Sequence, residues 1–153
     1  MSRITPILAT VFLLFLWTDD SAGAGRCWVS TTSVNFGSYN VLSATPTDST
    51  GTVSVYCNQE NFITVSIGPS ANSGGFKPRQ MRLTTGNDLM NYNLYRDTTR
   101  TQIWGDGTGG NFTVSGIVPR RNTLYQTVFG RIPAGQDISA GLYMETLTVT
   151  ITW

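Results

Sequence analysis

The sequence contains no histidine, only two cysteines and few charged residues. Its 153 residues include ten Lys and Arg and nine Asp and Glu. Without histidine, Ser-His and Cys-His nucleophiles are excluded, and two cysteines alone cannot complete the tetrahedral shell of a zinc site. The scattered, nearly balanced charges also lack the basic stripe of a nucleic-acid binder. We therefore expect no catalytic residues, no cofactor, no metal and no nucleic-acid partner.

Carboxylates and a glycine-rich loop are the remaining candidates for chemistry. Asp97 and Asp106 could form an acid/base pair if the fold brought them together, but nothing in their spacing requires it. The loop from Trp104 to Gly110 has the glycines of a phosphate or calcium site but lacks a following Lys and further oxygen ligands. We expect it to be a tight connection around a packed Trp104.

Arginine is the commonest cation, which could indicate carboxylate or phosphate recognition. We expect instead that these side chains occupy solvated strand and loop positions: Arg26, Arg79, Arg82, Arg96 and Arg100.

No segment reaches the roughly 20 consecutive apolar residues that a membrane-spanning helix needs. A shorter apolar run covers residues 7–17, preceded by Arg3 and followed by Ala22-Gly23-Ala24. This arrangement is typical of a secretory signal peptide with its small-residue cleavage site. The sequence therefore predicts a cleaved signal peptide at 1–24, one exported domain at 25–153 and no membrane span after cleavage.

The two cysteines, Cys27 and Cys57, lie in the predicted exported domain. An even count in an oxidising compartment favours a disulfide. In the strand alternation Cys57 continues the face of Val53 and Val55, so we expect it to point inward. Cys27 shares a face with Val29, which predicts that the two thiols meet between two sheets.

Most of the domain alternates with the period of two that is typical of β-strands. The predicted strands are 50–57, 61–68, 79–84, 88–95, 111–118, 124–132 and a terminal strand from 146. Residues 124–132 are apolar on both faces, so this strand is either central or misassigned. The opening strand changes phase near residues 31–33, as when a strand bends or switches sheets. With no helical periodicity, the pattern predicts an antiparallel β-sandwich.

The terminal strand has the strongest alternation in the chain. Threonines at 146, 148, 150 and 152 form one face, and the other face consists of Leu147, Val149, Ile151 and Trp153. A strand this apolar normally has neighbours on both edges or a device that protects its edge. The pattern thus predicts a buried inner face and leaves open which strand pairs with it.

Several segments together resemble the spore coat protein U domain family, which includes subunits of archaic chaperone-usher pili. The segments are Cys27 with VNFGSY from Val34, TGTVSVYC ending at Cys57, RQM from Arg79, LMNYNLY from Leu89, IWGDGT from Ile103, FGRIPAGQ from Phe129 and GLY from Gly141. They cover essentially all of residues 25–153.

The resemblance implies an immunoglobulin-like sandwich that lacks its last strand and so has an open groove beside the terminal strand. A periplasmic chaperone would fill the groove first, and a strand from a neighbouring pilus or coat subunit would replace it at an outer-membrane usher. The implied groove residues are Leu147, Val149, Ile151 and Trp153. The implied function is that of a structural subunit of an exported fibre or coat at the cell surface, acting in adhesion or biofilm formation.

One departure from the family concerns the donor strand. Cleavage after Ala24 leaves only Gly25 and Arg26 before Cys27, too little for a donor segment. We therefore expect a terminal or non-donating subunit, or a secreted coat protein that does not polymerise. The alternative is a self-complete secreted carbohydrate-binding module that uses aromatic residues such as Trp28 or Trp104.

Overall fold

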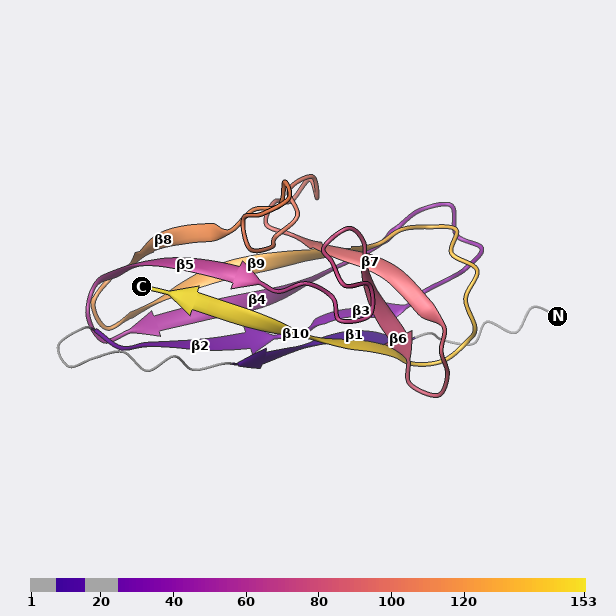
Figure 1. The fold of residues 1–153 in the computed structure, drawn as a ribbon, viewed down its shortest axis with the longest axis horizontal. Helices are drawn as coiled ribbons and strands as arrows, with labels where there is room; N and C mark the ends of the chain where they lie inside the picture. Colours follow the sequence, from indigo (N-terminus) through magenta and orange to yellow (C-terminus); the bar gives the residue numbers. More distant parts are fainter. Residues whose placement is uncertain (1–7, 16–24) are drawn as a thin grey trace.

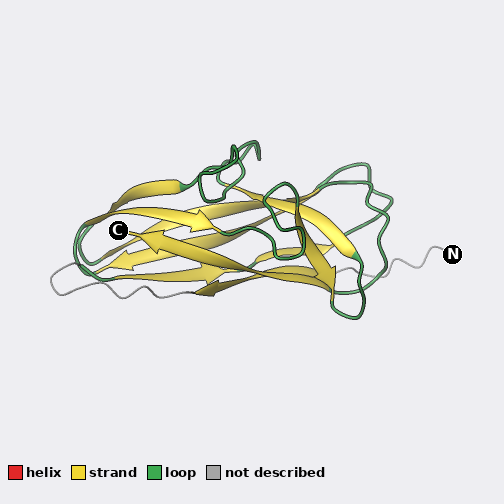
Figure 2. Cartoon of the chain, in the orientation of Figure 1, coloured by secondary structure: helices red, strands yellow, loops and turns green. Residues whose placement is uncertain are grey.

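The computed structural model describes residues 8–15 and 25–153, and every regular element in these ranges is a β-strand (Figure 2). The strands are β1 (Leu8–Phe15), β2 (Cys27–Thr32), β3 (Val34–Ser38), β4 (Thr47–Cys57), β5 (Asn61–Ile67), β6 (Arg79–Leu83), β7 (Leu89–Tyr95), β8 (Val114–Val118), β9 (Asn122–Ile132) and β10 (Tyr143–Thr152). No helix in the described ranges is long and apolar enough to cross a membrane.

The strands form two layers of an immunoglobulin-like sandwich (Figure 1). The first layer consists of β2, β4 and β9, all antiparallel. The second contains β8, β5 and β10, with β1 and β3 beyond β10. Strand β7 joins the layers because it pairs with β9 on one edge and with β6 on the other. The fold class predicted from the alternation is confirmed.

The core lies between the layers and is built from the inward residues of nearly every strand. Its fully buried members include Val53, Val55, Ile63, Val65, Ile67, Met81, Met90, Leu94, Trp104, Val128 and Ile132. The predicted strand positions agree well with this arrangement. Residues 124–132 fall in β9, which is central because it pairs with β4 and β7. The strand predicted from residue 111 begins only at Val114, since Asn111 and Phe112 belong to the preceding loop.

The phase change near residues 31–33 marks a switch between layers. Strand β2 ends at Thr32 in the first layer, and β3 starts at Val34 in the second. Two glycines of the first layer, Gly51 and Gly130, allow the segment from Thr32 to Phe36 to pass close to β4 and β9. A Cβ at Gly51 would lie 2.7 Å from the Thr32 carbonyl oxygen, and a Cβ at Gly130 would lie 2.6 Å from the Phe36 ring. Any larger residue at either position would push the crossing segment away.

The two cysteines form a disulfide, but its position differs from the prediction. Cys27 and Cys57 are directly opposite each other on the neighbouring strands β2 and β4, with a Cα–Cα distance of 4.1 Å. The bond therefore links two strands of one layer, whereas the alternation predicted a bond between layers. The inward orientation was correct for both residues, which are buried. Alternation gives the face of a strand and not the identity of its neighbour.

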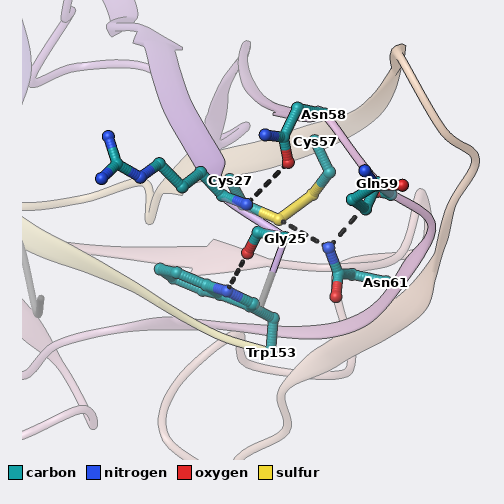
Figure 3. The surroundings of a disulfide bond; sticks show 8 residues. Gly25, Cys27, Cys57, Asn58, Gln59, Asn61 and Trp153 are labelled. Atoms are coloured by element: carbon teal, nitrogen blue, oxygen red, sulfur yellow. Dashed lines mark hydrogen bonds between the residues drawn. A yellow bond between two sulfur atoms is a disulfide. The ribbon is translucent and has the colours of Figure 1, made fainter. Parts of the chain in front are cut away.

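The surroundings of the disulfide tie the start of the domain to its end (Figure 3). The Arg26 amide donates to the Asn58 side-chain oxygen at 2.7 Å, and the Trp153 indole nitrogen donates to the Gly25 carbonyl at 2.8 Å. Residue 25 and the C-terminal residue thus meet at the end of the sandwich that carries the disulfide.

Reducing the disulfide is expected to lower the free energy of unfolding by roughly 3 to 4 kcal/mol, because the bond closes a loop with a separation of 30 residues. The measurement is thermal unfolding with and without reductant, with the double substitution of Cys27 and Cys57 to Ala as a second test. Equal melting temperatures with and without the bond would contradict the expectation.

Candidate functional site along the last strand

Strand β10 has different partners on its two edges. On one edge its first residues pair with β6, through Tyr143 and Leu83, and its later residues pair with β5, from Val149–Ile67 to Thr152–Thr64. Both pairings are antiparallel. This edge is therefore closed by strands of the domain itself.

The other edge of β10 is covered by β1, the strand formed by Leu8–Phe15. The pairing is parallel and runs from Ala9–Tyr143 to Phe15–Val149. The far edge of β1 pairs antiparallel with β3, from Leu8–Ser38 to Val11–Val34. Strand β1 thus separates β10 from β3, and both of those strands have backbone groups that face it. The predicted cleavage site at Ala22-Gly23-Ala24 lies outside the described residues, and the domain boundaries at 1–24 and 25–153 stay predictions.

The predicted groove residues lie on β10 and just beyond it. Leu147 and Val149 are each 1% exposed, and Ile151 is partly buried against the core. Trp153 follows the end of the strand and is 40% exposed. Only Leu147 and Val149 lie in the part of β10 that pairs with β1, whereas Ile151 and Trp153 lie past it. The assignment of these four residues to a groove stays a prediction.

Two further inward residues of β10, Tyr143 and Glu145, precede the predicted set. Both are buried and share the face of Leu147, and both pair with β1, opposite Ala9 and Val11. The alternation that revealed Leu147 extends back to them. The charge of Glu145 interrupted the apolar pattern, which is why the sequence interpretation began the strand at Thr146.

Glu145 is buried because neighbouring side chains satisfy its carboxylate. The hydroxyls of Tyr92 and Ser70 donate to it, and the Asn72 amide lies 3.4 Å from the same oxygen as Ser70. Burial, together with the negative charge of Glu145, raises the pKa of the Tyr92 hydroxyl well above its ordinary value. Tyr92 therefore stays protonated and remains a donor at physiological pH.

Arg79 is a second buried charge, contrary to the expectation that it would be solvated. It is 0% exposed, and its guanidinium donates to the carbonyl oxygens of Ile67, Gly68 and Trp104 and to the Asn93 side-chain oxygen. Burial lowers the pKa of Arg79 from its ordinary value. The position is explained by the geometry of the side chain, whose planar fork can bridge several acceptors at once.

Trp104, the aromatic residue of the glycine-rich loop, has a structural role in the core. Trp104 is fully buried and donates from its indole nitrogen to the Val65 carbonyl at 3.0 Å. The packed role expected of it is confirmed, and a role as a ligand-binding aromatic is wrong. In the described residues no cluster of His, Cys, Asp or Glu could hold a metal ion.

The two aspartates considered for catalysis each stabilise their own turn. Partial burial raises the pKa of Asp97, but hydrogen bonds from Thr99, Gln102 and Thr101 outweigh it, so the pKa lies well below its usual range. Hydrogen bonds from the side chain and backbone of Thr108 lower the pKa of Asp106. Both carboxyls are therefore ionised at neutral pH, and neither is held as a proton donor.

Comparisons with known proteins agree with this fold. The model of the Spore Coat Protein U domain matches residues 15–150. Protein U of Myxococcus xanthus is 36% identical over 134 residues, and the match covers 79% of this chain and 72% of Protein U.

A solved structure with a similar fold is that of the CsuC–CsuE chaperone–tip adhesion subunit pre-assembly complex from the archaic chaperone-usher Csu pili of Acinetobacter baumannii. The similarity has a TM-score of 0.59 at 22% identity and covers 85% of this chain and 40% of the matched chain. The family is one of structural proteins and not of enzymes, which agrees with the absence of catalytic residues expected from the sequence. The chain belongs to the spore coat protein U domain family.

Proposed function

We propose that this chain is an exported structural subunit of a surface fibre or coat, and that it accepts a β-strand from another polypeptide between β10 and β3. The observation that carries the proposal is the position of β1, which pairs with both strands and lies between them. An extended segment that adds to a sheet edge gains backbone hydrogen bonds along its length, and alternate side chains provide the specificity.

The residues around this position fit such a role. The β10 residues that pair with β1 alternate between buried and outward positions, and Tyr143, Glu145, Leu147 and Val149 are the buried ones. On the other side, Val34 and Phe36 of β3 are also buried. An incoming strand with apolar residues at every second position would complete the same core. The corresponding positions of β1 are Ala9, Val11, Leu13 and Phe15, which are all apolar.

The family and the pilus complex with a similar fold support a chaperone and neighbouring subunits as the partners of the proposed subunit. A periplasmic chaperone would supply the first strand, and a neighbouring subunit would supply the strand that replaces it at an outer-membrane usher. Adhesion or biofilm formation would be the outcome. The direct experiment is co-expression of the chain with a periplasmic chaperone of the chaperone-usher class, followed by affinity purification of the chaperone. A stoichiometric complex supports the proposal, whereas a free monomeric subunit contradicts it.

The substitution Val149→Asp is expected to reduce chaperone capture by at least roughly tenfold. Val149 is 1% exposed at the end of the segment paired with β1, and an unpaired carboxylate there would face a low-dielectric environment. The amount of subunit that co-purifies with the chaperone is the measured quantity.

The matched control is Thr146→Asp, which places the same charge on the exposed face of the same strand. Capture of this variant should equal that of the unsubstituted chain. If both variants are captured normally, β10 does not form the floor of the acceptor site. Because Val149→Asp could also weaken folding, Leu147→Ala serves as a milder second variant with the same expected direction.

A further inference from the structure

The outer face of the first layer carries exposed aromatic side chains at the end near the disulfide. Trp28 on β2 is directly opposite Tyr56 on β4, and the two rings are 5.6 Å apart between centroids. Tyr125 on β9 lies opposite Ser54, one row further along. The exposed fractions are 38% for Trp28, 38% for Tyr56 and 70% for Tyr125. Three neighbouring strands therefore present three aromatic rings on one face.

The remaining positions of this face carry hydroxyl groups. Ser30 and Ser54 are opposite each other, with their hydroxyl oxygens 2.7 Å apart, and Thr123 lies opposite Tyr56. We call the set Trp28, Ser30, Ser54, Tyr56, Thr123 and Tyr125 the aromatic face. None of its members is charged. The nearest charged side chain along β2 is the exposed Arg26, two residues before Trp28, and the charged pair Asp48–Arg131 lies eight positions along β4 from Tyr56.

We propose that the aromatic face binds an uncharged polysaccharide. Aromatic rings offer flat apolar surfaces with a negative face, which suits the carbon-bound hydrogens of a sugar ring, and serine and threonine hydroxyls both donate and accept hydrogen bonds. A neutral sugar chain leaves no charge unpaired on this surface. About a quarter of the residues of an ordinary protein are charged. A protein partner would therefore have to remove water from some of its charged groups, and the aromatic face has no opposite charge to pair with them.

The size of the face also favours a sugar chain over a second protein. Three strands at about 4.8 Å spacing and two rows of about 7 Å each give a face of roughly 200 Å². A stable protein interface buries about 800 Å² on each partner, several times this area. The face belongs to β2, β4 and β9, whereas the proposed strand-acceptor site lies between β10 and β3 of the other layer. Polysaccharide binding would therefore add to the proposed function without competing for the acceptor site.

The test is retention of the full chain on cellulose, chitin and starch, with alginate as the charged comparison. We expect retention on at least one of the neutral polymers, unchanged between low and high salt because no charges take part. The substitution Tyr125→Ala should weaken retention by roughly tenfold or more, since exposed aromatic anchors dominate such contacts. Tyr125→Phe keeps the ring and should stay within about threefold of the unsubstituted chain.

The matched control is Phe62→Ala, which removes a ring of similar exposure, 65%, from the other layer. It should bind as the unsubstituted chain does. The proposal is overturned if none of the three neutral polymers retains the chain, if alginate is preferred, or if Tyr125→Ala and Phe62→Ala bind equally. Loss of self-association in Tyr125→Ala, without any loss of sugar binding, would also overturn it and would identify a second copy of the chain as the occupant.

Discussion

A chain that starts at Gly25 is expected to unfold at a melting temperature roughly 10 to 20 °C below that of the full chain. Removing residues 1–24 takes away β1 and with it the backbone partner of β3 and of one edge of β10. Each lost hydrogen bond contributes about 1 kcal/mol, and the inward face of β10 would gain contact with water. A loss of roughly 3 to 6 kcal/mol would produce a shift of this size in a domain of this length. Thermal unfolding followed by circular dichroism provides the measurement.

Adding a peptide with the sequence of residues 8–15, extended by solubilising lysines, should restore most of the loss. Its matched control is a peptide with Asp at positions 11 and 13, which pair with Glu145 and Leu147 in the buried rows. A peptide with Ser at positions 12 and 14, in the rows of Thr146 and Thr148, should still restore stability. If the chain from Gly25 is as stable as the full chain without any peptide, the position between β10 and β3 needs no strand.

The same measurement distinguishes the two functions considered from the sequence. A self-complete secreted module that starts at residue 25 would be stable, and the peptide would leave its melting temperature unchanged. A strand-accepting subunit would be weak alone and would gain stability with any strand that matches the alternation of β10.

The substitution Arg79→Ala is expected to lower the free energy of unfolding by roughly 3 to 5 kcal/mol. The side chain is 0% exposed and donates to three backbone carbonyls and to Asn93. Alanine would leave these acceptors buried without a donor and would open a cavity beside Trp104. Urea unfolding of purified protein measures the change.

Arg82→Ala on the same strand is the matched control, because Arg82 is exposed and should change stability by less than about 1 kcal/mol. Arg79→Lys should fall between the two, since lysine keeps the charge but lacks the planar fork. Equal stability of Arg79→Ala and Arg82→Ala would show that the buried hydrogen bonds contribute nothing.

The strands themselves could be predicted because their signal is local. A strand that is buried on one face alternates wherever it pairs, so the alternation alone predicts the strands at residues 50–57, 61–68 and 88–95 without reference to their neighbours. The prediction weakened where a polar residue was buried by distant partners. Because of Glu145, the predicted last strand begins at Thr146 and not at Tyr143. Arg79 is predicted to be solvated, although both Glu145 and Arg79 are buried in the core.

By itself the sequence determined the β-sandwich class, the inward faces of the strands and the existence of one disulfide, because alternation and cysteine count depend on no long-range contact. Only the tertiary structure decided which strands are neighbours. It placed Cys27 and Cys57 on one layer, joined the two layers at β7 and set β1 between β10 and β3. Any strand edge can pair with any other edge that the fold brings beside it, and the period of two is the same in every strand. Alternation therefore does not identify the partner of a strand.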